Sequence, residues 1–94
     1  MPYASAYSKS FPKDWGKLTR SGRYNMQQLK SVMMQLIAGD TPLGMEFKDH
    51  QLTGSWLGYR ECHIGGDFLL IYQIYEEKMI FFSRVGTHSE LFKI

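Results

Sequence analysis

The segment Phe68-Leu-Leu-Ile-Tyr-Gln-Ile-Tyr75 decides the fold of this 94-residue chain. Its apolar side chains follow one another without alternation, which is typical of a strand buried on both faces. Such a strand lies in the middle of a sheet. The turn residues Gly65-Gly66-Asp67 precede it and Glu76-Glu77-Lys78 follow it, so we expect antiparallel partner strands on both sides.

The preceding partner begins at Trp56 and alternates with a period of two, so its side chains divide between two faces. One face holds Tyr59, Glu61 and His63, and the other holds Arg60, Cys62 and Ile64. The segment Met79 to Val85 completes an antiparallel meander. The first strand of this meander therefore carries polar chemistry on one side.

Two helices are expected before the sheet. The first runs from about residue 12 to 22, with Ser10 and Pro12 as cap and first turn and Gly22 as terminator. The second spans Asn25 to Ala38 and ends at Gly39. Its apolar residues recur at spacings of three and four: Met26, Leu29, Val32, Met33, Leu36 and Ile37. We interpret this stripe as a core face rather than a binding groove.

The remaining segments complete the layout. Residues 3 to 8 are expected to form a short edge strand, residues 40 to 55 a long loop, and residues 87 to 94 a short tail. The loop is expected to be ordered by Leu43, Phe47 and Leu52. The order β-α-α-β-β-β predicts an α+β fold, a twisted antiparallel meander sheet with two helices on one face. Residues 1–94 are expected to form a single domain.

Composition excludes several classes. Cys62 is the one cysteine, so neither an intramolecular disulfide nor a thiolate zinc site can form, and a reducing, cytoplasmic setting is the simplest interpretation. The longest apolar run, Phe68 to Tyr72, has five residues, whereas a membrane span needs about 18. No signal-like apolar region follows the first residues. We therefore expect a soluble protein without a membrane partner.

The charge is uneven along the chain. Residues 1 to 30 hold six basic residues against Asp14 alone, a net charge of +5, while residues 31 to 94 hold five against eight, a net charge of −3. Lys13, Lys17 and Arg20 are spaced to share one face of the first helix. This face can attract a polyanion or an acidic partner, or it can simply be a solvated surface.

Three histidines, His50, His63 and His88, each lie where a strand or loop meets a turn. Their separations of 13 and 25 residues match no common zinc motif. Imidazoles both accept and donate protons near neutrality, and a carboxylate such as Asp67 can orient one of them. Together they could cleave RNA: a base activates the 2′-hydroxyl, an acid protonates the leaving 5′-oxygen, and a cation stabilises the phosphorane. Neither metal nor cofactor is needed.

Arg84 and Arg60 are candidate phosphate clamps, and Phe92 or Tyr59 could stack on an unpaired base. By strict alternation Arg60 faces away from His63, so it forms an ion pair near the helices unless a bulge re-aims it. Phe92 could equally anchor the tail. Nucleophilic catalysis is disfavoured, because no Gly-x-Ser-x-Gly elbow exists and the only cysteine points toward the core.

Three ordered motifs then resemble one family over nearly the whole chain. They are Lys48-Asp49-His50-x-Leu-x-Gly-x-Trp-x-Gly-Tyr-Arg-Glu-Cys-His63, Asp67-x-Leu-Leu-Ile-Tyr72 and Arg84-x-Gly-Thr-His-Ser-Glu-Leu-Phe92. The chain resembles the YafQ-type branch of the RelE/ParE toxin superfamily. The resemblance implies a RelE-like fold and a toxin of a type II toxin-antitoxin pair, which cleaves translated mRNA on the ribosome and is neutralised by a cognate antitoxin.

The resemblance also assigns residues. His50, His63, Asp67 and His88 correspond to the proposed catalytic set of the family, and Glu61 and Phe92 to assisting positions. Glu61 stands where the family can have a shorter aspartate. The resemblance implies mRNA, ribosomal RNA and an antitoxin as partners, with direct DNA contact expected only through the antitoxin. Lys13, Lys17 and Arg20 are then candidate contacts to the ribosome or the antitoxin.

For the roles, we expect His88 to be the general acid, His50 or His63 the base, and Arg84 the phosphate clamp. Two alternatives remain. A toxin of the same fold can act without nuclease chemistry on another target such as gyrase, although three imidazoles favour the nuclease. A free-standing RNase is also possible, although the polar site is small for autonomous RNA binding.

Overall fold

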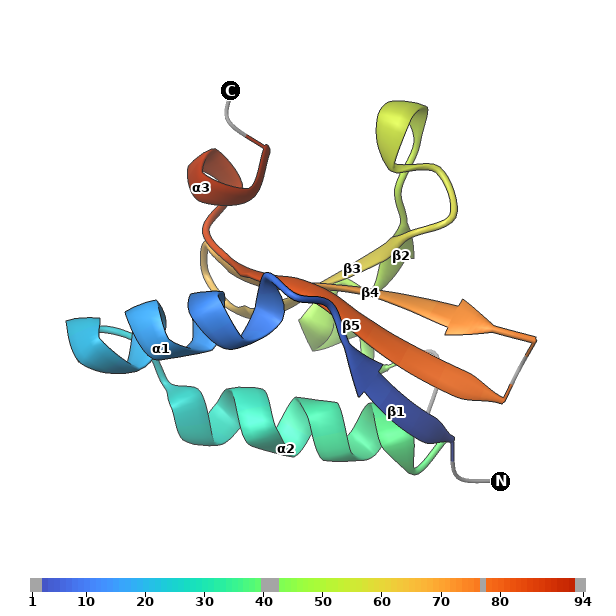
Figure 1. Cartoon of the computed structure of the whole chain (residues 1–94), viewed down its shortest axis with the longest axis horizontal. Coiled ribbons are helices and arrows are strands. Elements are labelled where there is room, and N and C mark those ends of the chain that lie inside the picture. The colour runs from blue at the N-terminus through green and yellow to red at the C-terminus, as the bar shows by residue number, and fades with distance from the viewer. Residues whose placement is uncertain (1–2, 40–42, 77, 93–94) are drawn as a thin grey trace.

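The computed structural model of the chain describes residues 3–39, 43–76 and 78–92. Five strands form one sheet in the order β1-β5-β4-β3-β2 (Figure 1). The strands are β1 (Ala4–Tyr7), β2 (His50–Gln51), β3 (Arg60–Gly65), β4 (Phe68–Tyr75) and β5 (Met79–Gly86). The helices are α1 (Phe11–Ser21), α2 (Met26–Ile37) and α3 (His88–Phe92), with single 3₁₀ turns at Met45–Phe47 and Gly54–Trp56.

Strand β4 lies in the middle of the sheet, as its unbroken apolar run predicts. It pairs antiparallel with β3 and β5, and its residues Phe68 to Tyr72 are all buried. The turn before it uses Gly66 at φ +53°, a left-handed conformation that glycine adopts without strain. The expected edge strand is β1, which runs parallel to β5 with Ala4 opposite Met79. The predicted meander and edge strand are therefore confirmed.

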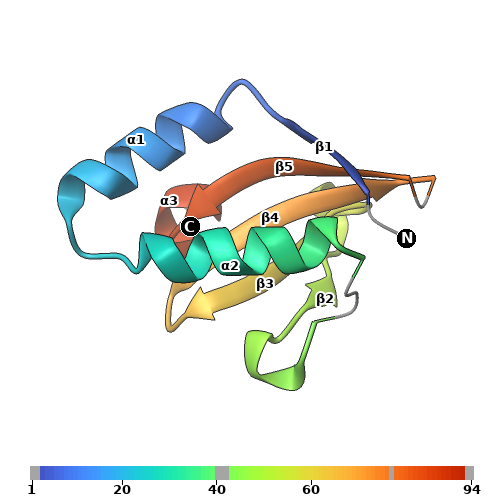
Figure 2. The same cartoon turned by 90° about the horizontal axis from the view of Figure 1, so that it is seen from below.

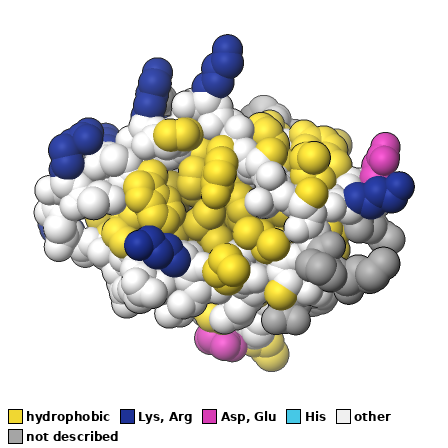
Figure 3. Space-filling model, turned by 60° about the horizontal axis from the view of Figure 1, so that its bottom comes forward, with side chains coloured by type: hydrophobic (Ala, Val, Ile, Leu, Met, Phe, Trp, Pro, Cys, Tyr) yellow, Lys and Arg dark blue, Asp and Glu magenta, His cyan; other side chains and the backbone are white. Residues whose placement is uncertain are grey.

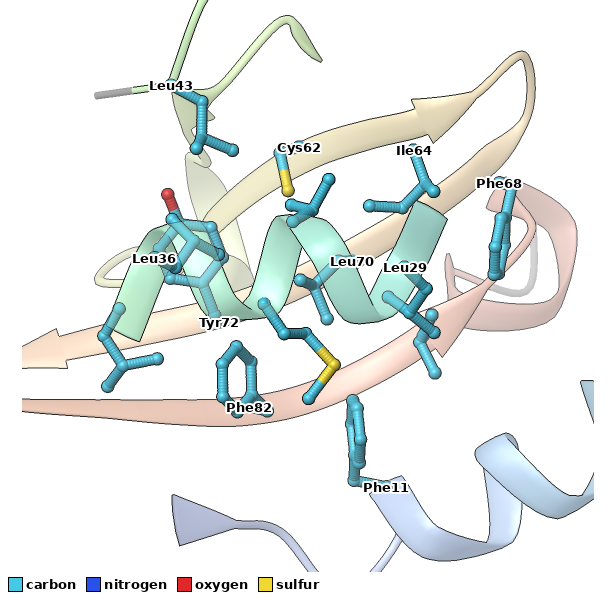
Figure 4. Close-up of a cluster of buried hydrophobic side chains, with 14 of the residues drawn as sticks. Phe11, Leu29, Leu36, Leu43, Cys62, Ile64, Phe68, Leu70, Tyr72 and Phe82 are labelled. Atoms are coloured by element: carbon cyan, nitrogen blue, oxygen red, sulfur yellow. The ribbon is translucent and has the colours of Figure 1, made fainter. Parts of the chain in front are cut away.

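Helices α1 and α2 lie together on one side of the sheet (Figures 1 and 2). The α2 residues Leu29, Val32, Met33 and Leu36 are buried, so the apolar stripe is a core face as predicted. They pack with side chains from one face of the sheet, among them Cys62, Leu70, Tyr72 and Phe82 (Figure 4). Helix α1 ends at Gly22, whose φ of +68° is the left-handed cap expected from the sequence.

The opposite face of the sheet has a smaller cluster. Leu69 and Ile71 of β4 pack there with Leu91 of α3. Leu52, Trp56, Tyr59 and Phe92 pack against this cluster and are partly buried. In Figure 1 this face is uppermost, with α3 above the end of β5.

Three boundaries differ from the sequence predictions. The strand expected from Trp56 begins at Arg60, because residues 54–56 form a 3₁₀ turn and Gly58 takes φ +96°. The expected loop contains strand β2 and two 3₁₀ turns, and the expected tail contains α3. Loop residues 40–42, residue 77 of the predicted turn, and residues 93–94 of the tail lie outside the described residues.

Among the helices of the described ranges, none is both long and apolar enough to cross a bilayer.

Candidate active site

The register of strands β2 and β3 brings the first two histidines together. His50 pairs with Glu61 across these antiparallel strands. His63 lies two residues after Glu61, and side chains alternate along a strand, so both project from the same face. The ring centroids of His50 and His63 are 6.4 Å apart. This is the face that carries α3, opposite α1 and α2.

The third histidine enters from a distant part of the chain. His88 is the first residue of α3, and its ring centroid lies 5.8 Å from that of His63. A reciprocal cap fixes this helix start: the Glu90 carboxylate accepts from the Thr87 backbone N–H at 3.1 Å, and the Thr87 hydroxyl accepts from the Glu90 N–H at 3.4 Å. The structure thus gathers all three predicted histidines.

Glu61 lies beneath the three imidazoles, with its side chain only 4% exposed. Its Oε1 atom is 3.1 Å from Nε2 of His63 and 3.7 Å from Nε2 of both His50 and His88. The first distance is a hydrogen bond, and the other two are too long to be one. One carboxylate oxygen therefore lies at the centre of the cluster but binds only His63 tightly.

Asp67, the predicted orienting carboxylate, contacts His88. Its Oδ1 atom accepts from Nδ1 of the ring at 2.7 Å and from the His88 backbone N–H at 3.2 Å. These two hydrogen bonds, the side-chain one first, lower the pKa of Asp67 below its ordinary value. Asp67 therefore stays ionised and holds the imidazole of His88 by the nitrogen farther from Glu61.

The other two rings are oriented by backbone carbonyls, which can only accept hydrogen bonds. Nδ1 of His50 donates to the Lys48 carbonyl at 2.6 Å, and Nδ1 of His63 donates to the Gly66 carbonyl at 3.2 Å. Each bond fixes a proton on Nδ1. His63 then has a hydrogen-bond partner at both nitrogens, whereas His50 keeps its Nε2 free.

Aromatic side chains border the histidines on the α3 side. The Phe92 ring lies 5.7 Å from the His88 ring and packs edge-on against Trp56 at 5.2 Å. Tyr59 packs edge-on against the same Trp56 at 5.1 Å. Phe92 is half-buried, so it anchors α3 and still presents a surface beside the cluster. Its predicted role in RNA binding stays a prediction.

The structure does not bring Arg60 to the histidines. Its guanidinium points to the helix side of the sheet, where Nε lies 3.2 Å from the Asp49 carboxylate. Of the two readings that alternation left open, the structure shows the ion pair near the helices. The register shift in β3 lies farther on, between His63 and Gly65, and so does not re-aim Arg60.

Arg84 lies in β5 opposite Ile71, on the face of the sheet that carries the histidines. Its guanidinium is bound by Asp14 of α1. Its Nε and Nη2 atoms donate to the two carboxylate oxygens of Asp14 at 2.7 and 3.1 Å. The hydrogen bond to Asp14 is the main reason that the pKa of Arg84 is raised. The predicted role of Arg84 as a phosphate clamp stays a prediction. In this role the guanidinium would bind the phosphate while Asp14 holds it in place.

Cys62 is fully buried in the helix-side core, as its alternation predicts. Burial raises the pKa of its thiol, so the reactive thiolate is not formed near neutral pH. This agrees with the expectation that nucleophilic catalysis is not the chemistry of this chain.

The basic residues Lys13, Lys17 and Arg20 are all exposed on α1, as predicted. Lys17 also reaches across to α3, where its Nζ lies 2.9 Å from the Glu90 carboxylate. The cationic face of α1 is therefore joined to the helix that carries His88.

Sequence reasoning missed four supporting residues. The Thr-x-x-Glu spacing of Thr87 and Glu90 is a capping-box signal that predicts a helix start at His88. Asp14 and Asp49 had no such signal, since their partners Arg84 and Arg60 lie 70 and 11 residues away. Only the tertiary structure reveals these contacts.

Known proteins resemble this chain in both sequence and structure. Residues 3–93 match the family described as bacterial toxin of type II toxin-antitoxin system, YafQ. The chain is 43% identical over 86 residues to the mRNA interferase toxin YafQ of Escherichia coli (strain K12), with 92% of this chain and 91% of the relative covered.

Solved structures agree. The crystal structure of the E. coli DinJ-YafQ toxin-antitoxin complex matches with a TM-score of 0.85 and 40% identity, covering 98% of this chain and 99% of that chain. The crystal structure of a metal-bound toxin from Helicobacter pylori matches with a TM-score of 0.82 and 39% identity, covering 97% and 99%. Within the described ranges of this chain, no group of three or more His, Cys, Asp and Glu side chains is arranged to hold a metal ion. The matches confirm the predicted α+β fold.

Proposed function

The chain belongs to the YafQ family of bacterial toxins from type II toxin-antitoxin systems, and from this premise we propose that it is an mRNA interferase, a ribosome-dependent endoribonuclease that cleaves translated mRNA without a metal. The observation that carries the proposal is the convergence of three imidazoles on one oxygen of Glu61. A set of proton donors and acceptors around a single point is what cleavage by an internal 2′-hydroxyl requires.

The general base is His50. Its Nδ1 proton is held by the Lys48 carbonyl, and its Nε2 is 3.7 Å from Glu61, too far for a hydrogen bond. In the neutral ring Nε2 therefore carries a free lone pair. His50 is also half exposed, so the ribose 2′-hydroxyl can reach this nitrogen. The base accepts the hydroxyl proton as the bond from O2′ to phosphorus forms.

The general acid is His88. Asp67 binds its Nδ1 at 2.7 Å, while Nε2 again lies 3.7 Å from Glu61, so a proton on this nitrogen is free to be donated. This nitrogen gives its proton to O5′ as the bond from phosphorus to O5′ breaks. The products are a 2′,3′-cyclic phosphate on one fragment and a 5′-hydroxyl on the other, so that atoms and charge balance.

His63 acts by charge rather than by proton transfer. Both of its nitrogens bind acceptors, Gly66 at 3.2 Å and Glu61 at 3.1 Å, and the ring is the least exposed of the three. An imidazolium held in this way stabilises the charge that develops on the phosphorane oxygens. Arg84 supplies a second cation, and Phe92 offers a ring to an unpaired base.

Dependence on the ribosome is supported by the distribution of charge. The N-terminal 30 residues carry +5, and of the three exposed cations of α1, Lys17 contacts Glu90 of α3. A cationic surface next to the small reactive site suits ribosomal RNA, which would hold the toxin while the translated mRNA is cleaved.

A protein antitoxin would need a different surface. Between α1 and α2 lies an open groove of about 550 Å³, lined mostly by apolar side chains and by Lys30. Figure 3 shows apolar side chains gathered in the middle of this face, with Lys and Arg side chains at its margin. We expect an amphipathic segment of the antitoxin, with acidic residues at its borders, to bind here.

The test is cleavage of a defined mRNA by purified toxin, with and without ribosomes and with and without EDTA. Wild type should cut only ribosome-bound mRNA, leave 5′-hydroxyl ends, and keep its rate in EDTA. His88→Ala should lose cleavage, and the exposed α2 variant Gln27→Ala should keep it. Full cleavage by His88→Ala at matched protein levels would refute the assignment.

A further inference from the structure

Asp49 is a buried carboxylate that the proposed mechanism does not use. Its side chain is only 1% exposed although it neighbours the half-exposed His50 in sequence. It projects to the helix side of the sheet, away from the imidazoles, together with Arg60 and Tyr72. An ionised group this deeply buried persists only when its charge is met by well-placed donors.

Three donors meet it, each from a different part of the chain. The Tyr72 hydroxyl donates to Oδ1 at 2.6 Å, Arg60 Nε donates to the same atom at 3.2 Å, and the Leu43 backbone N–H donates to Oδ2 at 3.2 Å. Tyr72 and Arg60 belong to the neighbouring strands β4 and β3, whereas Leu43 precedes the first 3₁₀ turn. The carboxylate therefore ties this loop to the middle of the sheet.

The hydrogen bonds of Asp49 constrain the residues on either side of it in the sequence, Lys48 and His50. Lys48, just before Asp49, has a left-handed backbone with φ 50° and ψ 41°, which a residue with a side chain adopts only when its surroundings hold it. This conformation aims the Lys48 carbonyl at Nδ1 of His50, 2.6 Å away. In the sequence, Asp49 thus lies between Lys48, whose carbonyl fixes the proton on Nδ1 of His50, and His50 itself.

We propose that Asp49 is a positioning residue of the active site: by anchoring the loop to Tyr72 and Arg60, it holds the Lys48 carbonyl against Nδ1 of His50 and so keeps Nε2 unprotonated and aimed at the substrate. The proposal rests on the proposed function, in which His50 is the base. It assigns catalytic importance to a network on the face of the sheet opposite the histidines.

The Tyr72 phenol keeps its proton in this network. Burial, followed by the hydrogen bond to Asp49, raises the pKa of the Tyr72 phenol, so Tyr72 remains a donor at all physiological pH values. Among the described residues, Tyr72 and Arg60 have no hydrogen bond to a histidine. Their effect on catalysis therefore passes through Asp49 and the loop backbone.

The experiment reads the His50 proton directly and the reaction separately. Long-range ¹H–¹⁵N NMR at about pH 8, where an ordinary imidazole is mostly neutral, reports which ring nitrogen of His50 carries the proton. Single-turnover cleavage on ribosomes gives the maximal rate and the toxin concentration at half-maximal rate. The variants are Asp49→Asn, the milder Tyr72→Phe, and Ile80→Val as a buried control in β5.

Wild type should show the Nδ1–H form of His50. Asp49→Asn should lose this preference and slow the maximal rate about 10- to 100-fold, with little change in the half-maximal concentration, since a misplaced base affects chemistry rather than binding. Tyr72→Phe should shift both readouts in the same direction by less. Ile80→Val should change neither, although it also disturbs the core.

Two results would overturn the proposal: an unchanged Nδ1–H form in folded Asp49→Asn and Tyr72→Phe, or a lost Nδ1–H form with a wild-type maximal rate. Failure of the proposed function looks different. If wild type cleaves no mRNA and the Nδ1–H form still disappears in Asp49→Asn, the positioning of His50 stands and only the reaction assigned to it is rejected.

Discussion

Asp67 and His88 are joined by two hydrogen bonds to a single carboxylate oxygen, one from the ring at 2.7 Å and one from the backbone at 3.2 Å. The contact links the turn before β4 to the start of α3, 21 residues later in the chain. It therefore both orients the proposed acid and pins the short helix that carries it.

Because of this contact, the free energy of unfolding depends on pH in the acid range. The pKa of Asp67 is lower in the folded chain than in the unfolded chain, mainly because of the His88 side chain. The stabilising contribution is thus complete above the unfolded pKa of about 4 and disappears as the pH falls through the folded value. Wild type should unfold at a higher temperature than Asp67→Asn at pH 6, and the difference should shrink as the pH falls below about 4. A difference that is constant over this range would contradict the linkage.

Variants of the Arg84–Asp14 pair can distinguish a structural role of Arg84 from a phosphate-binding role. Asp14→Asn removes the charge partner but leaves the guanidinium, whereas Arg84→Gln removes the guanidinium. Both should lower the free energy of unfolding by about 1 kcal/mol, a modest value because the pair is partly exposed. Only Arg84→Gln should slow the maximal cleavage rate strongly. Equal slowing by both variants would mean that Arg84 serves the fold and not the phosphate.

The cap of α3 should matter more than the ion pair that joins it to α1. Glu90→Ala removes the acceptor for Thr87 and should cost about 1 kcal/mol of stability, with slower cleavage because His88 loses its helix start. Lys17→Ala removes only an exposed ion pair and should cost less than about 0.5 kcal/mol. Urea unfolding and single-turnover cleavage measure both. Equal losses in the two variants would contradict this order.

The cationic face of α1 should control binding to the ribosome. Lys13, Lys17 and Arg20 changed together to Glu should weaken co-sedimentation with ribosomes, with a smaller dependence on salt than wild type. The double variant Lys13→Glu with Arg20→Glu leaves the Lys17–Glu90 pair intact and checks that α3 is not disturbed. Unchanged co-sedimentation of the folded triple variant at low salt would refute this role.

The groove between α1 and α2 should bind the antitoxin and not the ribosome. Met34 lines it and is largely exposed, so Met34→Glu should leave folding and mRNA cleavage intact. It should weaken antitoxin binding by at least about tenfold, since a charge would enter an apolar contact. Calorimetry with the cognate antitoxin measures this, and Met45→Glu is a matched exposed control outside the groove.

The sequence by itself determined the long elements and their faces, though not the short strand β2 or the short helix α3. The unbroken apolar run of β4 identified the central strand, the period of two put Glu61 and His63 opposite Cys62, and the spacing of three and four marked the core face of α2. These predictions succeed because buried apolar side chains recur with the period of the local helix or strand. This period can be seen in the sequence alone.

Only the tertiary structure decided which groups meet. Asp67 faces His88, Asp14 takes Arg84, and Asp49 binds Tyr72 and Arg60. No local period records such contacts, because they form where loops and strand ends distant in sequence converge. Partners two or three residues away orient the rings of His50 and His63, but His88 is oriented by Asp67 from 21 residues away. The proposed division of the three histidines into base, acid and fixed charge therefore depends on the tertiary structure, because only folding brings the three rings together.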